Sequence, residues 1–224
     1  MRLNVLRLSR CMGLAVPEPT RAARFYQDTL DVTSLRTETS VLLALDDLRL
    51  YLDPGPQGRL MFEMITDDME AARKRVLALG MEVLSWGGAG HTNLVRDPHG
   101  LIWNIHWGEP HVESLTPPNR SLATSWMGIS HEEPYAAAQY YAQLFQVPMH
   151  ELVDGTFALS SAGARFRVRR GANTPTIWLS NEADIEALMN SGFQPGRGST
   201  LVDPFGITWA PSPLAPCESA VVSM

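Results

Sequence analysis

The motif DPHGLIW at residues 97–103 recurs as DPFGITW at residues 203–209. Asp-Pro followed two positions later by glycine is typical of a tight turn, and the apolar residues after it indicate a strand. The two copies start 106 residues apart (203 − 97) and match at four of seven positions. A repeat of this kind means that one supersecondary unit is used more than once, so it decides which folds need to be considered.

Helical segments precede both copies at corresponding places. RFYQDTL at residues 24–30 follows a strand-like run, and its apolar positions lie on one helical face. QYYAQLF at residues 139–145 is its counterpart in the second half. We expect Thr20 to cap the first of these helices and Pro134 to lie in the first turn of the second.

Another pair of helices lies between these segments and the turns. One is expected to end at Gly80, and its counterpart is expected to begin at Asn181 and end at Gly192. Each half therefore reads as strand, helix and three strands, twice over. The four units are predicted at about residues 5–53, 58–108, 121–170 and 174–211.

The ordered set of motifs resembles the vicinal oxygen chelate superfamily, which includes glyoxalase I, the bleomycin-resistance proteins and the extradiol dioxygenases. Besides the two turns, the resemblance rests on residues 24–30 and 67–72 and on their weaker copies at 139–145 and 183–187. It implies an α+β fold of four βαβββ modules, in which each pair of modules curls a mixed sheet around a cup. The predicted organisation is a first glyoxalase-like domain (1–109), a linker (110–120), a second such domain (121–211) and a flexible tail (212–224).

Composition limits the function. The chain has 224 residues, of which 45% are hydrophobic and 19% charged, and its formal net charge of −6 argues against a nucleic-acid or anionic-membrane partner. It contains no apolar run long enough for a transmembrane helix and no signal-peptide pattern at Met1. Its two cysteines exclude a disulfide framework, so we expect a cytoplasmic protein. Of 18 basic residues only Lys74 is lysine, which indicates a GC-rich genome.

The resemblance implies where a divalent metal would be bound, and those places lack its usual ligands. In the first half the three positions carry Cys11, Met61 and Asn104. In the second half they carry Trp126, Ile177 or Trp178, and Ala210. A divalent site needs three or more lone-pair donors, such as His, Glu or Gln. We therefore expect no metal and no other cofactor.

Strand alternation nominates other residues of the first cup. Glu63 shares a face with Met61, His106 shares one with Asn104, and Arg59 lies at the rim. The candidates for proton transfer are His106, Glu63 and His91, the last on the preceding strand. The resemblance implies that the fifth and eighth strands are antiparallel neighbours. Glu63 and His106 are then expected to lie about 13 Å apart, at about 3.3 Å per residue, and to flank a ligand from two sides without touching.

In the second cup the same argument nominates Trp126, Trp178, Thr208 and Ala210, with Arg165 and Arg167 on one face of a strand. An indole at position 126 either fills the cup or stacks on a flat ligand. Trp103, Trp107 and Trp209 are predicted to lie in the core, and His99 in a solvated turn. The full set of predicted ligand-binding residues is Cys11, Arg59, Met61, Asn104, Trp126, Trp178, Thr208 and Ala210.

These features favour a metal-independent small-molecule binding protein of the glyoxalase and bleomycin-resistance type. Such a protein sequesters an aromatic or bulky natural product, as in antibiotic resistance or transport of a secondary metabolite. The alternative is a metal-free isomerase, lyase or cyclase of secondary metabolism that uses His106 and Glu63 for proton transfer. A metal-dependent glyoxalase or dioxygenase is the less favoured third reading. The pattern leaves open which cup works, and whether the protein is a monomer or a homodimer.

Overall fold

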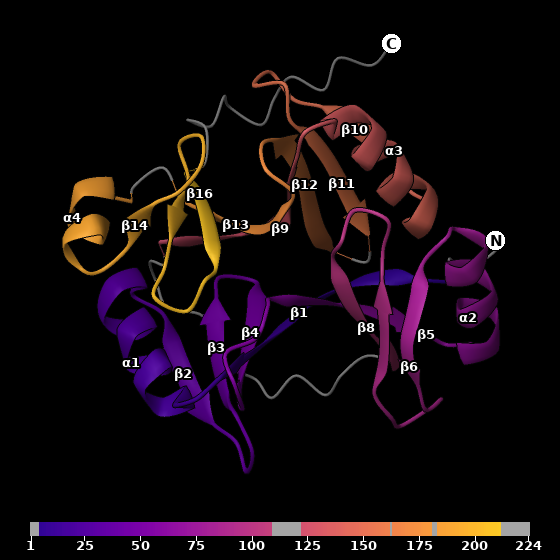
Figure 1. Ribbon diagram of the computed structural model, residues 1–224, viewed down its shortest axis with the longest axis horizontal. Coiled ribbons are helices and arrows are strands. Elements are labelled where there is room, and N and C mark those ends of the chain that lie inside the picture. The colour runs from indigo at the N-terminus through magenta and orange to yellow at the C-terminus, as the bar shows by residue number, and fades with distance from the viewer. Residues whose placement is uncertain (1–4, 109–121, 162, 181–182, 212–224) are drawn as a thin grey trace.

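The computed structural model describes residues 5–108, 122–161, 163–180 and 183–211, and contains two mixed sheets of eight strands each (Figure 1). Each sheet is built from two consecutive βαβββ units. The predicted fold class, with four such units in two tandem glyoxalase-like halves, is confirmed. The predicted linker (110–120) and tail (212–224) lie outside the described residues.

The first sheet has the strand order β2-β3-β4-β1-β5-β8-β7-β6. Its middle pairs are β1 with β4, which are parallel, β1 with β5, which are antiparallel, and β5 with β8, which are parallel. The elements of its two units are β1 (Arg7–Val16), α1 (Pro19–Leu30), β2 (Thr33–Arg36), β3 (Val41–Leu45), β4 (Leu48–Pro54), β5 (Met61–Thr66), α2 (Met69–Ala78), β6 (Glu82–Trp86), β7 (Asn93–Arg96) and β8 (Ile102–Trp107).

The second sheet repeats this order as β10-β11-β12-β9-β13-β16-β15-β14. The directions of its middle pairs are also the same. Its elements are β9 (Ala123–His131), α3 (Pro134–Phe145), β10 (Met149–Glu151), β11 (Phe157–Ser161), β12 (Ala164–Arg170), β13 (Thr174–Leu179), α4 (Ile185–Asn190), β14 (Gln194–Pro195), β15 (Leu201–Val202) and β16 (Thr208–Pro211).

The helix starts differ in part from those predicted. Pro134 is the first residue of α3, as expected. Thr20 is already inside α1, because Pro19 occupies the first helical position and Glu18 precedes it without a side-chain cap. The side chain of Asp184 caps α4 by accepting from two backbone N–H groups, so Asn181 is not the cap, and residue 181 lies outside the described residues.

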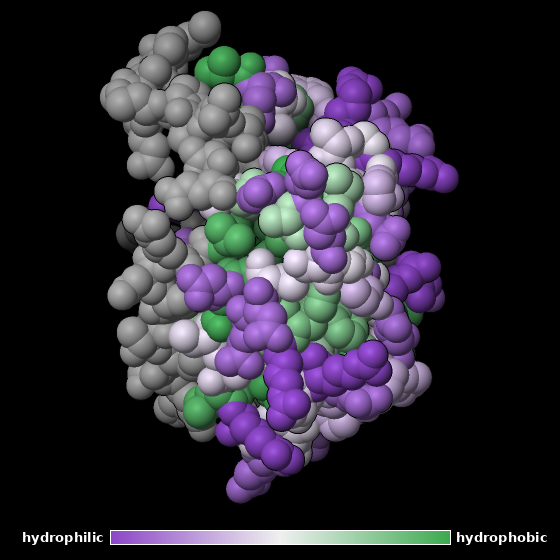
Figure 2. All heavy atoms as spheres, turned by 90° about the vertical axis from the view of Figure 1, so that its left-hand side faces the viewer, coloured by the Kyte–Doolittle hydropathy of each residue, from purple (hydrophilic) through white to green (hydrophobic). Residues whose placement is uncertain are grey.

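Each sheet buries one face under its helices, and the two helix-covered faces contribute to one continuous hydrophobic core. α1 lies beside α4 at one side of the molecule, and α2 lies beside α3 at the other (Figure 1). On the first of these sides hydrophobic residues reach the surface in the middle of the face, with hydrophilic residues around them (Figure 2). Phe25 of α1 contacts Phe193 and Phe205 there, across the boundary between the halves.

The repeated Asp-Pro-x-Gly turns also join the halves. One oxygen of Asp203 accepts from the backbone N–H groups of Phe205 and Ile207, which closes the turn. The other oxygen accepts from Trp209 Nε1 of the same half at 2.8 Å and from the Tyr26 hydroxyl of the opposite half at 2.7 Å. Burial raises the pKa of the Asp203 carboxyl, and these four hydrogen bonds partly offset that effect.

The first turn makes the mirror arrangement. Asp97 accepts from its own turn, from Trp103 Nε1 at 2.8 Å and from the Tyr141 hydroxyl of α3 at 2.8 Å. Each aspartate that closes a turn in one half is therefore also the acceptor for a helix of the other half. The motif that identified the repeat thus also fixes how the two repeats pack.

Two of the three tryptophans predicted for the core are buried. Trp103 and Trp209 are fully buried, whereas Trp107 is 62% exposed. Trp107 is the last residue of β8. Within the described residues no helix has both the length and the apolarity needed to cross a bilayer.

Candidate functional site

Three neighbouring strands, β1, β5 and β8, form the centre of the first sheet. Met12, Phe62 and Trp103 point into the hydrophobic core. Side chains alternate along a strand, so Cys11, Glu63 and Asn104 point to the opposite face. We call this face of the first sheet, turned away from its helices, the first cup, and the corresponding face of the second sheet the second cup.

Glu63 and His106 are in contact in the first cup. Glu63 Oε1 lies 3.2 Å from His106 Nε2, which contradicts the predicted separation. The prediction assumed antiparallel strands, but β5 and β8 are the first and last strands of one unit and run parallel, with Glu63 beside Asn104 and Ile65 beside His106. Residues that are offset by two positions across a pair of strands are diagonal neighbours, and long side chains at such positions can touch.

Asn104 makes a second contact with the same imidazole nitrogen. Its amide Nδ2 lies 2.8 Å from His106 Nε2, while its Oδ1 accepts from the Asn93 backbone N–H at 3.2 Å. The Oδ1 contact fixes the amide orientation, so His106 Nε2 faces one acceptor, the Glu63 carboxylate, and one donor, the Asn104 amide. A protonated Nε2 donates to Glu63, and an unprotonated Nε2 accepts from Asn104. Both protonation states of His106 thus have a partner already in place.

The electrostatic setting favours the protonated state. The hydrogen bond with Glu63 raises the pKa of His106 above its usual value, burial lowers it, and the negative charge of Glu63 raises it further. The His106 side chain is 35% exposed and that of Glu63 is 12% exposed. The imidazole is therefore the member of the pair that a ligand in the cup reaches first.

Cys11 completes the centre of the first cup as a neutral thiol. The residue is 1% exposed, and its backbone N–H donates to Ser9 Oγ at 3.0 Å. Burial and the negative charge of Glu63 raise the pKa of the thiol to about 12. The thiolate is the form that acts as nucleophile, so this setting disfavours a nucleophilic role.

The register corrects the position assigned to β5. The residue beside Asn104 is Glu63, whereas Met61 pairs with Ile102 two residues away and its methyl group lies over Gly13. The metal-ligand positions implied by the resemblance are therefore Cys11, Glu63 and Asn104. Glu63 is engaged by an imidazole, Cys11 is protonated, and Asn104 contributes only an amide.

This donor set does not fit a divalent ion that needs three His or carboxylate ligands. In the part of the chain that the structure describes, no group of three or more His, Cys, Asp or Glu side chains could hold a metal. The corresponding positions of the second cup are Trp126, Trp178 and Ala210, and the last two are direct partners in the β13–β16 ladder. None of these three side chains offers a lone pair to a metal.

Two predicted residues of the first cup are not brought to the Glu63–His106 pair. Arg59 is exposed in the segment before β5, and His91 is exposed in the loop between β6 and β7. Asn93, the first residue of β7, is buried and holds that loop together. Its side chain bonds the backbone of Gly87, Gly88 and His91, and also the Ile105 carbonyl.

The second cup contains a stack of cationic side chains on an indole. Arg165 pairs directly with Trp126 across the β12–β9 ladder, and Arg167 is the next residue on the same face. The Arg167 guanidinium carbon lies 4.2 Å from the centre of the Trp126 ring, and that of Arg165 lies 5.6 Å from it. These are cation–π distances, so the two arginines of β12 are the groups that pack on the Trp126 indole.

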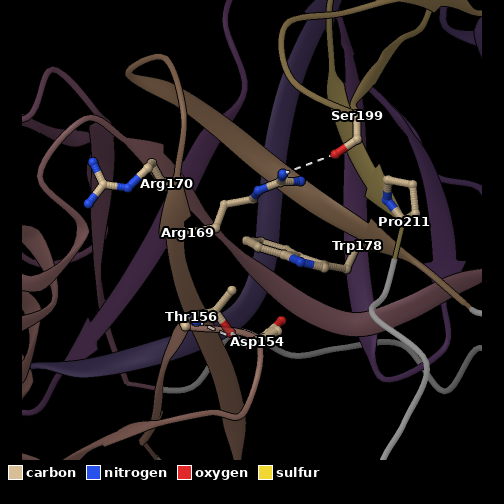
Figure 3. A pocket seen from close by; sticks show the side chains of 8 residues that line it. Asp154, Thr156, Arg169, Arg170, Trp178, Ser199 and Pro211 are labelled. Atoms are coloured by element: carbon tan, nitrogen blue, oxygen red, sulfur yellow. Dashed lines mark hydrogen bonds between the residues drawn. The ribbon is translucent and has the colours of Figure 1, made fainter.

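A cavity of about 650 Å³ opens on the same half (Figure 3). Trp178 is buried beneath it, and Arg169 reaches over the indole from β12 to the Ser199 hydroxyl at 3.4 Å (Figure 3). Thr208 and Ala210, also predicted for this site, lie in β16 beside Thr176 and Trp178. The residues lining the cavity are Asp154, Gly155, Thr156, Arg169, Arg170, Trp178, Ser199 and Pro211.

A histidine pair at the boundary between the halves was not predicted. His99 Nδ1 lies 3.0 Å from His131 Nε2, and the two rings are nearly perpendicular. His99 is therefore half-buried rather than solvated, and burial lowers its pKa. Its ring also contacts Tyr140 and Tyr141. The pair forms because the first turn packs against the end of β9 in the other half, and the sequence carried no signal for that contact.

Comparison with known proteins agrees with this architecture. The family model of the glyoxalase-like domain matches residues 11–105, which is most of the first half. No curated protein matches the chain at a significant level. For the second half, the likeness to a glyoxalase-like domain therefore rests on its fold and on the internal repeat.

Solved structures match both halves together. A Mn(II)-bound glyoxalase from Novosphingobium aromaticivorans is 16% identical, with a TM-score of 0.60 over 93% of this chain and 82% of the other. Homoprotocatechuate 2,3-dioxygenase from Arthrobacter globiformis is 16% identical, with a TM-score of 0.61 over 93% and 80%. A 2,2',3-trihydroxybiphenyl 1,2-dioxygenase from Sphingomonas wittichii is 14% identical, with a TM-score of 0.59 over 92% and 90%. At these identities the likeness is one of fold.

Proposed function

We propose that this protein binds a small organic molecule without a metal ion. The proposal starts from a fold of two tandem domains of the glyoxalase-like, vicinal oxygen chelate type. The observation that carries the proposal is the set of side chains that each cup has at the positions where relatives would bind a metal. The first offers a protonated thiol, a carboxylate engaged by an imidazole, and an amide. The second offers two indoles and a methyl group at the same places.

The second cup supports an aromatic or bulky ligand. Its cavity of about 650 Å³ lies in the size range of small-molecule sites, which is about 300–1,000 Å³. Trp178 lines this cavity together with Arg169 and Arg170, and Trp126 is partly exposed on the same face of the sheet. Sequestration of a natural product, as in drug resistance or transport in the cytoplasm, is the biological role that we attach to this site.

Native mass spectrometry of untagged protein, purified without chelator, tests the proposal. We expect one organic molecule per chain, which denaturation releases for identification, and a reduced occupancy in a Trp126→Leu variant. Arg21→Gln, on the exposed surface of α1, is the control and is expected to keep full occupancy. A stoichiometric metal adduct in wild-type protein would contradict the proposal and restore glyoxalase or dioxygenase chemistry.

A second candidate function is favoured by the first cup. His106 Nε2 has an acceptor and a donor in place for its two protonation states, which is what a group that takes up and releases a proton needs. In this reading His106 exchanges a proton with a carbon or oxygen acid in the cup, and Glu63 positions the imidazole and raises its pKa. The reaction class is a metal-free isomerisation, elimination or cyclisation.

Solvent deuterium incorporation tests this second candidate. A panel of aryl ketones and aryl aldehydes with acidic α-hydrogens is incubated with the protein in D₂O and followed by proton NMR. Wild-type protein is expected to exchange at least one member of the panel faster than His106→Gln does. Equal exchange rates for the two proteins would remove His106 from the mechanism and leave the binding function alone.

A further inference from the structure

We propose that the second cup recognises an anionic aromatic molecule, with a carboxylate held by Arg167 and Arg169 and a flat ring held against the indoles of Trp126 and Trp178. The proposal rests on the binding function proposed above and adds the chemical class of the ligand. Three independent observations carry it: a stripe of arginines without carboxylate partners, buried guanidinium donors without acceptors, and an aromatic-floored cavity beside them.

The arginines form a stripe along one strand. Arg165, Arg167 and Arg169 alternate along β12, so all three point to the cup, spaced by about 6.6 Å at about 3.3 Å per residue. Within the described ranges none of the three forms a salt bridge. Asp154 is the acidic group whose charge acts on Arg167 and Arg169. Asp46 interacts electrostatically with Arg165, so two carboxylates act on three guanidinium groups, and the face stays positive in a protein whose net charge is −6.

Arg167 has hydrogen-bond donors that the described part of the protein does not satisfy. Its Nε and Nη1 atoms are buried and have no acceptor among these residues. Burial lowers the pKa of the guanidinium, with the charge of Asp154 opposing that effect. Buried unpaired donors are costly. Nε and Nη1 lie on different edges of the guanidinium, so a bound carboxylate would accept from one of them and reduce that cost.

Arg169 supplies a second anchor beside the cavity. Its Nη2 reaches the Gly198 carbonyl at 3.3 Å and the Ser199 hydroxyl at 3.4 Å, and these long contacts hold the guanidinium over the cavity (Figure 3). Thr156, also in the lining, adds a hydroxyl that already bonds Asp154 at 2.7 Å. The cavity therefore presents positive charge and hydroxyl groups around an apolar floor.

The indoles of Trp126 and Trp178 favour a ligand with a flat ring. Trp178 lies under the cavity with 1% of its surface exposed, and Trp126 is partly exposed on the same face of the sheet. Indole faces attract both guanidinium groups and other aromatic rings. A purely aliphatic acid would use the arginines but leave these surfaces uncovered, and a neutral aromatic would leave the buried donors of Arg167 unpaired. Only a ligand with both features satisfies the whole face.

Isothermal titration with three probes tests the proposal: 2-naphthoate, the neutral isostere 2-naphthamide, and cyclohexanecarboxylate. We expect 2-naphthoate to bind at least about ten times more tightly than either of the others, since a charge-assisted hydrogen bond left unpaired corresponds to about that factor. Arg167→Gln is expected to lower naphthoate affinity to that of the amide without changing amide binding. Trp126→Leu is expected to weaken both naphthyl probes, and the control Arg21→Gln neither.

Circular dichroism spectra and melting curves establish that each variant is folded before it is titrated. Equal affinity of wild-type protein for 2-naphthoate and 2-naphthamide, or no binding of 2-naphthoate, would overturn the proposal. Unchanged naphthoate affinity in Arg167→Gln would also overturn it. A neutral molecule found by native mass spectrometry would refute the anionic class while leaving the binding function standing, so the two failures are distinguishable.

Discussion

Replacing Tyr26 or Tyr141 by phenylalanine removes one hydrogen bond between the two halves of the chain. Each hydroxyl donates to a buried aspartate of the opposite half, at 2.7 Å to Asp203 and 2.8 Å to Asp97. A hydrogen bond to a charged group contributes about 1.5–3 kcal/mol. Each aspartate keeps three other donors, so we expect the lower part of that range, about 2 kcal/mol, for each variant.

The two losses are expected to add, because Tyr26 belongs to α1 and Tyr141 to α3, and these helices lie at opposite sides of the molecule (Figure 1). The double variant should then lose about 4 kcal/mol, out of a total stability of about 5–15 kcal/mol for a typical protein. At about 2–4 °C per kcal/mol for a chain of this size, each single variant should melt about 4–8 °C below wild type.

Urea unfolding, followed by both circular dichroism and tryptophan fluorescence, measures these changes. Tyr135→Phe is the matched control, because its hydroxyl only accepts from the exposed Gln139 side chain. It should stay within about 0.5 kcal/mol of wild type. Single variants that also stay within that margin would refute the reasoning that the Asp-Pro-x-Gly aspartates bind the halves together.

Four further outcomes are expected from the same geometry. NMR titration should place the pKa of His106 above its usual value in wild type and below it in Glu63→Gln, because burial alone remains; an unmoved pKa would show that the contact is not formed in solution. The pKa of His106 is raised in the folded state, so the stability that its protonation contributes is present below the unfolded pKa and is lost as pH rises through the folded pKa. The stability difference between wild type and Glu63→Gln should therefore shrink at high pH. In a Cys217→Ser background, Cys11 should resist a thiol reagent at pH 7.5 until the protein unfolds, and rapid labelling of native protein would contradict its burial and its pKa of about 12. Gly128→Ala should destabilise the fold by about 1–3 kcal/mol, because a Cβ there would lie 1.8 Å from the backbone carbonyl oxygen of β12; wild-type stability would show that this pair of strands is looser than described.

Much of the fold was predictable because the repeat is local. The turns at 97–103 and 203–209 and the helices before them have short-range signals, and their order determines the four units. Hairpin chemistry and helical periodicity need no knowledge of the rest of the chain. The helix starts at Pro19 and Asp184 were missed because several polar residues near each start compete as caps.

The site was less predictable because it depends on pairing between distant strands. Whether β5 and β8 are parallel decides whether Glu63 meets His106, and alternation alone cannot give the direction. The stripe of arginines on β12 was visible from alternation, but their contact with Trp126 depends on the β9–β12 register. The His99–His131 pair depends on how the two halves pack, which no local pattern encodes.

Elemental analysis of untagged protein, produced in medium supplemented with manganese, iron, nickel and zinc and purified without chelator, tests the central claim most directly. The donor sets of the two cups predict metal far below one equivalent per chain, and no change in metal content in Glu63→Gln or Asn104→Ala. One equivalent of a single divalent metal in wild type, lost in Glu63→Gln, would contradict the account and assign the first cup to metal-dependent chemistry.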